Sequence, residues 1–107
     1  MTFSEMIEAV KKNPCEEKRA QDDNYLEVVV KKPDLKAFSS VLQDYFGPPF
    51  KPEGKSPSAE AERVAQPYGG VRGNQTMYFR RTDEGTEVAL LWPWGCGTLL
   101  TLKIIRR

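Results

Sequence analysis

The chain contains no histidine. Histidine is the side chain whose ordinary pKa lies closest to neutral pH, and it is the commonest metal ligand in proteins. Its absence excludes Ser-His-Asp and Cys-His catalytic groups, histidine metal sites and histidine acid–base chemistry in a chain that acts alone. No other nucleophile stands beside an evident base in the sequence. We therefore expect a protein that is not an enzyme and has no catalytic residues.

Cysteine is scarce as well, since the chain has only Cys15 and Cys96. The two form no CxxC pair, and two thiolates without histidine are too few for structural zinc, which takes four ligands. We expect two free thiols in a reducing compartment, with a single Cys15–Cys96 disulfide as the alternative. A catalytic role for Cys96 is disfavoured, because no base lies near it in the sequence. We predict no bound metal and no cofactor.

Long apolar runs are also missing. The longest, residues 26–30 and 88–93, are far shorter than the roughly 20 residues that a membrane-spanning helix needs. The first residues do not show a basic segment followed by an apolar one, so no signal peptide is expected. We predict a cytoplasmic protein without membrane association.

Net charge is nearly absent, because 16 basic residues face 15 acidic ones, for a total of +1. This balance disfavours a strongly basic nucleic-acid module. The basic residues gather toward the end of the chain, where Tyr78, Arg80 and Lys103 would form a crude stacking platform for single-stranded nucleic acid. The sequence signature of RNA-recognition sheets is missing, however, so a nucleic-acid partner is not expected.

The hydrophobic periodicity that is present predicts helices and strands in one domain of 107 residues. Thr2 and Glu5 form a capping box at the first helix, and Gly47 marks the end of the second. The predicted order is a helix over 2–12, a strand over 25–32, a helix over 35–46, a short helix over 57–66, and strands over 75–82, 86–92 and 98–105. Residues 15–24 are polar and aperiodic, which indicates a loop or a frayed helical tail.

This order predicts an α+β two-layer sandwich. Its four-stranded, mostly antiparallel sheet would carry two helices on one face, in the order α-β-α-β-β-β, with a long Pro/Gly-rich connection over residues 47–73. The crossover from the first strand would be right-handed if that strand paired in parallel. So long a connection in a small domain is either functional or mobile.

Alternation along the strands predicts which side chains face the helices. Residues assigned to the inward face are Leu26, Val28, Val30, Met77, Phe79, Val88, Leu90, Trp92, Leu100, Leu102 and Ile104. The face left open would carry Val29, Tyr78, Leu91, Leu99 and Ile105 among charged residues. So apolar a face is typical of a homodimer interface or a site for a protein partner. The alternative is that residues 47–73 cover it.

Two glycine-rich stretches supply the candidate binding residues. In Tyr68–Gln75, the glycines would let backbone amides approach a ligand and Arg72 would pair with an anion, unless the stretch is only a flexible entry to a strand. In Trp92–Gly97, an exposed tryptophan would anchor a partner, unless both tryptophans fill the end of the core. The predicted binding residues are Tyr68, Gly69, Gly70, Arg72, Gly73, Tyr78, Arg80, Trp92 and Trp94.

From these residues we expect a small non-enzymatic interaction module. It would self-associate or bind a protein partner through the open sheet face and the Gly-rich loop. The alternative is a binder of a small molecule or anion at the Tyr68–Gln75 loop.

Overall fold

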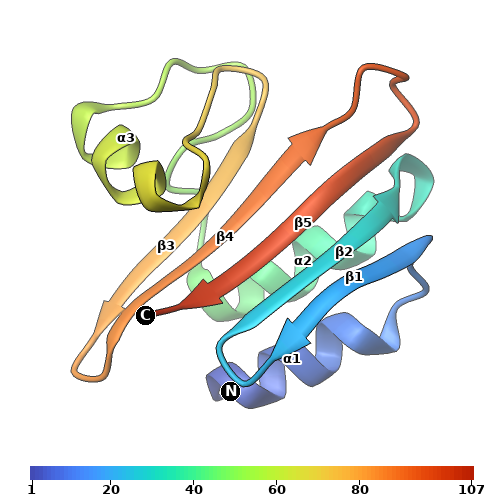
Figure 1. Ribbon diagram of the computed structural model, residues 1–107, viewed down its shortest axis with the longest axis horizontal. Coiled ribbons are helices and arrows are strands. Elements are labelled where there is room, and N and C mark those ends of the chain that lie inside the picture. Colours follow the sequence, from blue (N-terminus) through green and yellow to red (C-terminus); the bar gives the residue numbers. More distant parts are fainter.

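The computed structural model describes residues 1–107 and contains a five-stranded antiparallel sheet with three α-helices (Figure 1). The helices are α1 (Phe3–Lys12), α2 (Leu35–Phe46) and α3 (Ala59–Ala65), and the strands are β1 (Glu17–Asp22), β2 (Tyr25–Lys31), β3 (Thr76–Thr82), β4 (Gly85–Pro93) and β5 (Leu99–Arg106). The strands lie in the order β1-β2-β5-β4-β3. The α+β class is confirmed. The predicted four-stranded sheet lacks one strand, and the short helix expected over 57–66 is α3, which adds a third helix to the two predicted on one face of the sheet.

The strand that the prediction missed is β1, at one edge of the sheet. It pairs antiparallel with β2, with Glu17 opposite Val29, and a bulge interrupts the register between Lys18 and Ala20. Nearly all of its side chains are exposed, so the strand carries no apolar alternation from which to predict it. Charged side chains and a bulge are how an edge strand avoids pairing with another chain.

The sheet contains no parallel pair. Strand β2 runs antiparallel to β5, with Tyr25 opposite Ile105, and the remaining neighbours are antiparallel as well. The right-handed parallel crossover considered above therefore does not arise.

Helices α1 and α2 cover one face of the sheet, which we call the helix-covered face (Figure 1). The predicted capping box of Thr2 and Glu5 is present at α1, and Gly47 ends α2 with a positive φ of 83°. The buried cluster on this face comprises Phe3, Met6, Val10, Leu26, Val28, Val30, Phe38, Leu42, Tyr78, Ala89, Leu91, Leu102 and Ile104. None of the three α-helices is long and apolar enough to cross a bilayer.

The opposite face is partly covered by the 47–73 connection, because α3 packs there against β3 and β4 (Figure 1). Its buried cluster is Ala61, Ala65, Val71, Met77, Val88 and Leu90, with Val64, Tyr68, Phe79 and Trp92 half-buried around it. Part of the long connection is therefore the cover that was considered as an alternative above.

The face assignment was wrong for β3 and β4. Tyr78 and Leu91 were expected on the open face, but they belong to the helix-covered face. Met77, Val88 and Leu90 were expected under α1 and α2, but they lie under α3. Both faces of these strands are covered, so both alternating sets are apolar and the pattern does not distinguish them.

Candidate functional site

A proline-rich segment, residues 47–55, runs along the outer edge of β3, and we call it the strap. Lys51 exchanges two backbone hydrogen bonds with Met77, and the Gly54 amide donates to the Gly73 carbonyl over 2.8 Å. The Lys51 side chain is only 2% exposed, and its Nζ donates to the carbonyls of Gly73 and Gln75. Burial lowers the pKa of this ammonium, and the charge of Glu53 opposes part of that effect. The strap is thus held to the sheet both by backbone hydrogen bonds and by the buried Lys51 ammonium.

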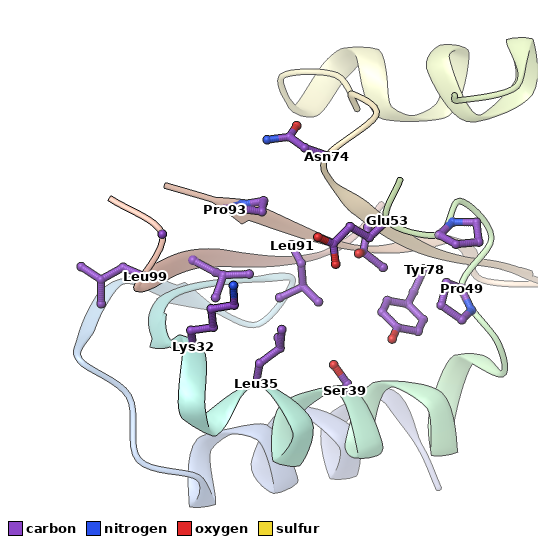
Figure 2. A pocket seen from close by; sticks show the side chains of 14 residues that line it. Lys32, Leu35, Ser39, Pro49, Glu53, Asn74, Tyr78, Leu91, Pro93 and Leu99 are labelled. Atoms are coloured by element: carbon purple, nitrogen blue, oxygen red, sulfur yellow. The ribbon is translucent and has the colours of Figure 1, made fainter. Parts of the chain in front are cut away.

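A pocket of about 260 Å³ opens between the strap, the first half of α2 and the ends of β4 and β5 (Figure 2). Its apolar walls come from four leucines and three prolines, namely Leu35, Leu91, Leu99, Leu100, Pro49, Pro52 and Pro93. The pocket lies on the helix-covered face, where the helix layer stops short of the strand ends. Apolar walls with a few polar groups between them are typical of sites for small molecules.

Six polar side chains line the same pocket, namely Lys32, Ser39, Glu53, Asn74, Thr76 and Tyr78. None of them forms a hydrogen bond or an ion pair with another group of the protein. Tyr78 is the most telling, because it is only 1% exposed and yet its hydroxyl has no protein partner. Figure 2 shows the hydroxyls of Tyr78 and Ser39 turned into the cavity. The hydroxyl thus reaches the cavity without a partner in the protein, and it is free to donate to or accept from a molecule that enters the pocket.

Two opposite charges also face this cavity. Lys32 reaches in from the turn before α2, and Glu53 reaches in from the strap (Figure 2). Both side chains are exposed, and they form no ion pair with each other. The pocket therefore offers a cation and an anion at separate points of its lining.

At the other end of the helix-covered face, the polar groups bind each other instead. The Glu87 carboxylate is 3% exposed and accepts a hydrogen bond from the Tyr45 hydroxyl. Arg80 lies with Nε 3.6 Å from Glu87 and with its guanidinium 4.5 Å from the centre of the Tyr45 ring. Burial, together with the bond to Glu87, raises the pKa of Tyr45 to about 12. At this end, which we call the network end, the three side chains bind one another beside a second pocket of about 330 Å³.

The predicted binding residues are not gathered in one place. Among the nine, only Tyr78 lines the pocket, and Arg80 belongs to the network at the opposite end. Tyr68 packs beside α3 on the other face of the sheet. Arg72 is exposed, with its backbone amide donating to the Gln75 side chain, and the Gly73 carbonyl is taken by Lys51 and Gly54.

Gly69 and Gly70 have structural reasons for being glycine. Both have positive φ, of 104° and 84°. A Cβ at Gly69 would lie 2.6 Å from the Trp92 ring, whereas at Gly70 nothing lies within 4 Å. The first glycine thus makes room for Trp92, and both adopt a backbone conformation that other residues rarely take.

The two tryptophans lie on the face opposite α1 and α2. Lys103 places Nζ 4.0 Å from the centre of the Trp92 ring. Trp94 donates from Nε1 to the Thr101 hydroxyl over 2.8 Å, and Arg19 covers its ring. Both rings are half-buried and packed against neighbours, which leaves less of them for a partner than an exposed anchor would offer. The Trp92 Nε1 is buried and has no hydrogen-bond partner.

Sequence reasoning missed Lys32, Ser39 and Glu53 as pocket residues. Lys32 follows Lys31 at the end of a strand and Glu53 lies in the proline-rich connection, so neither charge stands out in the sequence, and Ser39 lies on a helix that predicts only packing. No spacing in the sequence relates the three, because the strap brings Glu53 to the pocket through its bonds with residues 73–77. The only available signal was the long proline-rich connection itself.

Both cysteines are free and exposed, so no disulfide joins them. The Cys96 thiol accepts a hydrogen bond from the Thr98 hydroxyl over 3.3 Å, and bonds from Thr98 lower the pKa of that thiol. No group of three or more Cys, Asp or Glu side chains lies close enough together to hold a metal ion. Compared with known proteins, the chain matches no family model, no curated protein and no solved structure.

Proposed function

We propose that this protein is a non-enzymatic binding protein that takes a small polar molecule in the pocket between α2 and the strap. The observation that carries the proposal is the Tyr78 hydroxyl, which belongs to a residue only 1% exposed, has no partner in the protein and is turned into the cavity. A hydrogen bond from a ligand to this hydroxyl would contribute about 0.5–1.5 kcal/mol net. The expected small-molecule binding is thus retained, but moved from the Tyr68–Gln75 loop to the strap.

The dimensions of the pocket support a small ligand. A volume of about 260 Å³ lies just below the range of ordinary ligand sites, which begins at roughly 300 Å³. In liquid water this volume would hold about nine molecules, at roughly 30 Å³ each. A molecule with the bulk of an amino acid or a dipeptide fits this volume.

Self-association and protein-partner binding have weaker support. Part of the face on which that hypothesis depended is covered by α3, and elsewhere on it Val29, Thr101 and Ile105 are buried by their neighbours. The free edge at β1 is charged and bulged, which disfavours strand addition. The large apolar side chains that remain exposed are Met1 and Phe50, too few for a stable dimer interface of about 1,200 Å² or more.

The proposal is tested by titrating the isotopically labelled full-length chain with a library of small polar compounds and following its backbone amides by NMR. We expect hits to shift amides of residues 32–39, 49–53, 74–78 and 91–100, and Tyr78→Phe to weaken them about fivefold or more, as for one lost hydrogen bond. Tyr68→Phe is the matched control, because Tyr68 lies outside the pocket, and it should leave binding unchanged. If no compound shifts the pocket amides, or if Tyr78→Phe binds every hit as well as the wild type, the proposal is wrong.

A further inference from the structure

The charges and walls of the pocket are distributed unevenly, and this distribution specifies a ligand. Lys32 lies on the side of Leu99 and Leu35, where the wall is aliphatic, and Glu53 faces the cavity from the strap, with Tyr78 on the far side (Figure 2). One part of the cavity thus combines a cation with apolar surface, and the other combines an anion with hydroxyl groups.

A ligand of a single charge fits this lining poorly. A simple anion drawn to Lys32 would share the small cavity with Glu53, and a simple cation drawn to Glu53 would share it with Lys32. Like charges brought together in a confined site cost affinity. Lys51 does not remove the charge of Glu53 by direct pairing, because its Nζ donates to the backbone carbonyls of Gly73 and Gln75.

We propose that the ligand is a zwitterion of dipeptide size, with its carboxylate at Lys32, an aliphatic side chain beside that carboxylate, and its ammonium at Glu53. This inference rests on the proposed function and names its ligand class. The aliphatic side chain would lie on the leucine wall, which removes apolar surface from water. The peptide group would lie between the two charges, within reach of the Tyr78 hydroxyl, which can donate to a carbonyl or accept from an amide.

The test uses glycyl-leucine, which places leucine next to the carboxylate, and two derivatives that each lack one charge. N-acetyl-glycyl-leucine lacks the ammonium, and glycyl-leucinamide lacks the carboxylate. We expect each derivative to bind about three- to tenfold more weakly than glycyl-leucine, the range for ion pairs that are only partly removed from water. Leucyl-glycine, which moves the aliphatic group to the polar side, should also bind more weakly.

Two variants assign each end of the ligand to its residue. Lys32→Met should weaken glycyl-leucine but not glycyl-leucinamide, which should bind somewhat more tightly because the Lys32 ammonium no longer repels that cation. Glu53→Gln should likewise weaken glycyl-leucine but not the N-acetyl compound, which should bind somewhat more tightly because the Glu53 carboxylate no longer repels that anion. Lys32 and Glu53 are exposed, so both variants should fold, and Lys36→Met and Glu60→Gln are controls outside the pocket.

The possible outcomes separate this inference from the proposed function. If library compounds shift the pocket amides but the capped peptides bind as well as glycyl-leucine, the zwitterion is wrong and the binding function stands. Tighter binding of the N-acetyl compound would replace the zwitterion with an anion. If no compound shifts the pocket amides, both proposals fail.

Discussion

The polar side chains at the two ends of the helix-covered face differ in whether they have partners within the protein. At one end, Tyr45, Arg80 and Glu87 bind one another, and the Glu87 carboxylate is buried with its partners in place. At the other end, Tyr78 is buried more completely than Tyr45, but its hydroxyl faces a cavity and has no partner in the protein. The same face thus holds a satisfied network and an unsatisfied pocket.

This difference separates stability from function. The hydrogen bonds that a polar group forms within the protein offset the free-energy cost of removing it from water, so the network at Glu87 is explained by folding alone. The free hydroxyl of Tyr78 is not explained by bonds within the fold, because it faces the cavity and a phenylalanine would fill the same buried space for the ring. A ligand would therefore explain the polar residues of the pocket. The comparison can be tested by making the same substitution at both ends.

The largest effect is expected at the strap, which builds the open end. Lys51→Met removes two charge-assisted hydrogen bonds and leaves the carbonyls of Gly73 and Gln75 without that donor. We expect the free energy of unfolding to fall by about 3 kcal/mol, measured by urea denaturation. Hydrogen exchange should quicken in residues 49–55 and 73–77 before it does in α1.

The control for this variant is Lys55→Met, which removes the same charge from an exposed position of the strap. Its unfolding free energy should stay within about 0.5 kcal/mol of the wild type. If Lys51→Met is no more destabilising than this control, the buried ammonium does not hold the strap, and the pocket wall has another support.

At the end that holds the Tyr45–Arg80–Glu87 network, Tyr45→Phe should cost about 2 kcal/mol at neutral pH, because the buried Glu87 carboxylate loses its hydroxyl donor. The loss should depend on pH. The folded state raises the pKa of Tyr45 to about 12 from 10.0, so it holds the phenolic proton more tightly than the unfolded chain does. That contribution is fully present below pH 10 and is lost as the pH rises to about 12.

The measurement is the difference in unfolding free energy between wild type and Tyr45→Phe, taken in steps from pH 8 to about 12. Taking the difference cancels groups common to both proteins, including Tyr25, whose pKa is also raised, and Lys51, whose pKa is lowered. The difference should shrink above pH 10. A difference that stays constant would mean that the Tyr45 proton is not what the network holds.

The sequence predicted the elements whose patterns come from a single buried face. Helices α1 and α2 each bury one stripe, so their period was clear in the sequence. The residues assigned to the inner face of β2, and Leu102 and Ile104 of β5, do lie under the helices, although the other face of both strands is partly buried as well. The capping box at Thr2 and the stop at Gly47 are local chemistry, which the sequence states directly.

The other features of the fold and the pocket could not be predicted from the sequence, for physical reasons that differ from one feature to the next. Strand β1 is solvated on nearly every side chain, so no apolar period marks it. Strand β4 is covered on both faces, so its period does not say which face is which. The pocket depends on the strap, and the strap is placed by bonds between Lys51 and residues 73–77, which are distant in sequence. Of the candidate residues, Tyr78 was singled out as a surface anchor, and the structure instead buries it at the pocket floor.

The smallest effect on stability is expected for Tyr78→Phe. A small effect here would distinguish the Tyr78 hydroxyl from the Tyr45 hydroxyl, which binds within the protein. Removing the hydroxyl breaks no bond within the protein, so the unfolding free energy should change by less than about 0.5 kcal/mol or rise slightly. Tyr45→Phe makes the same chemical change and is the matched control, with its loss of about 2 kcal/mol. Urea denaturation at neutral pH compares the two variants. A loss at Tyr78 as large as that at Tyr45 would mean that the Tyr78 hydroxyl stabilises the fold, and its free position would no longer require a ligand.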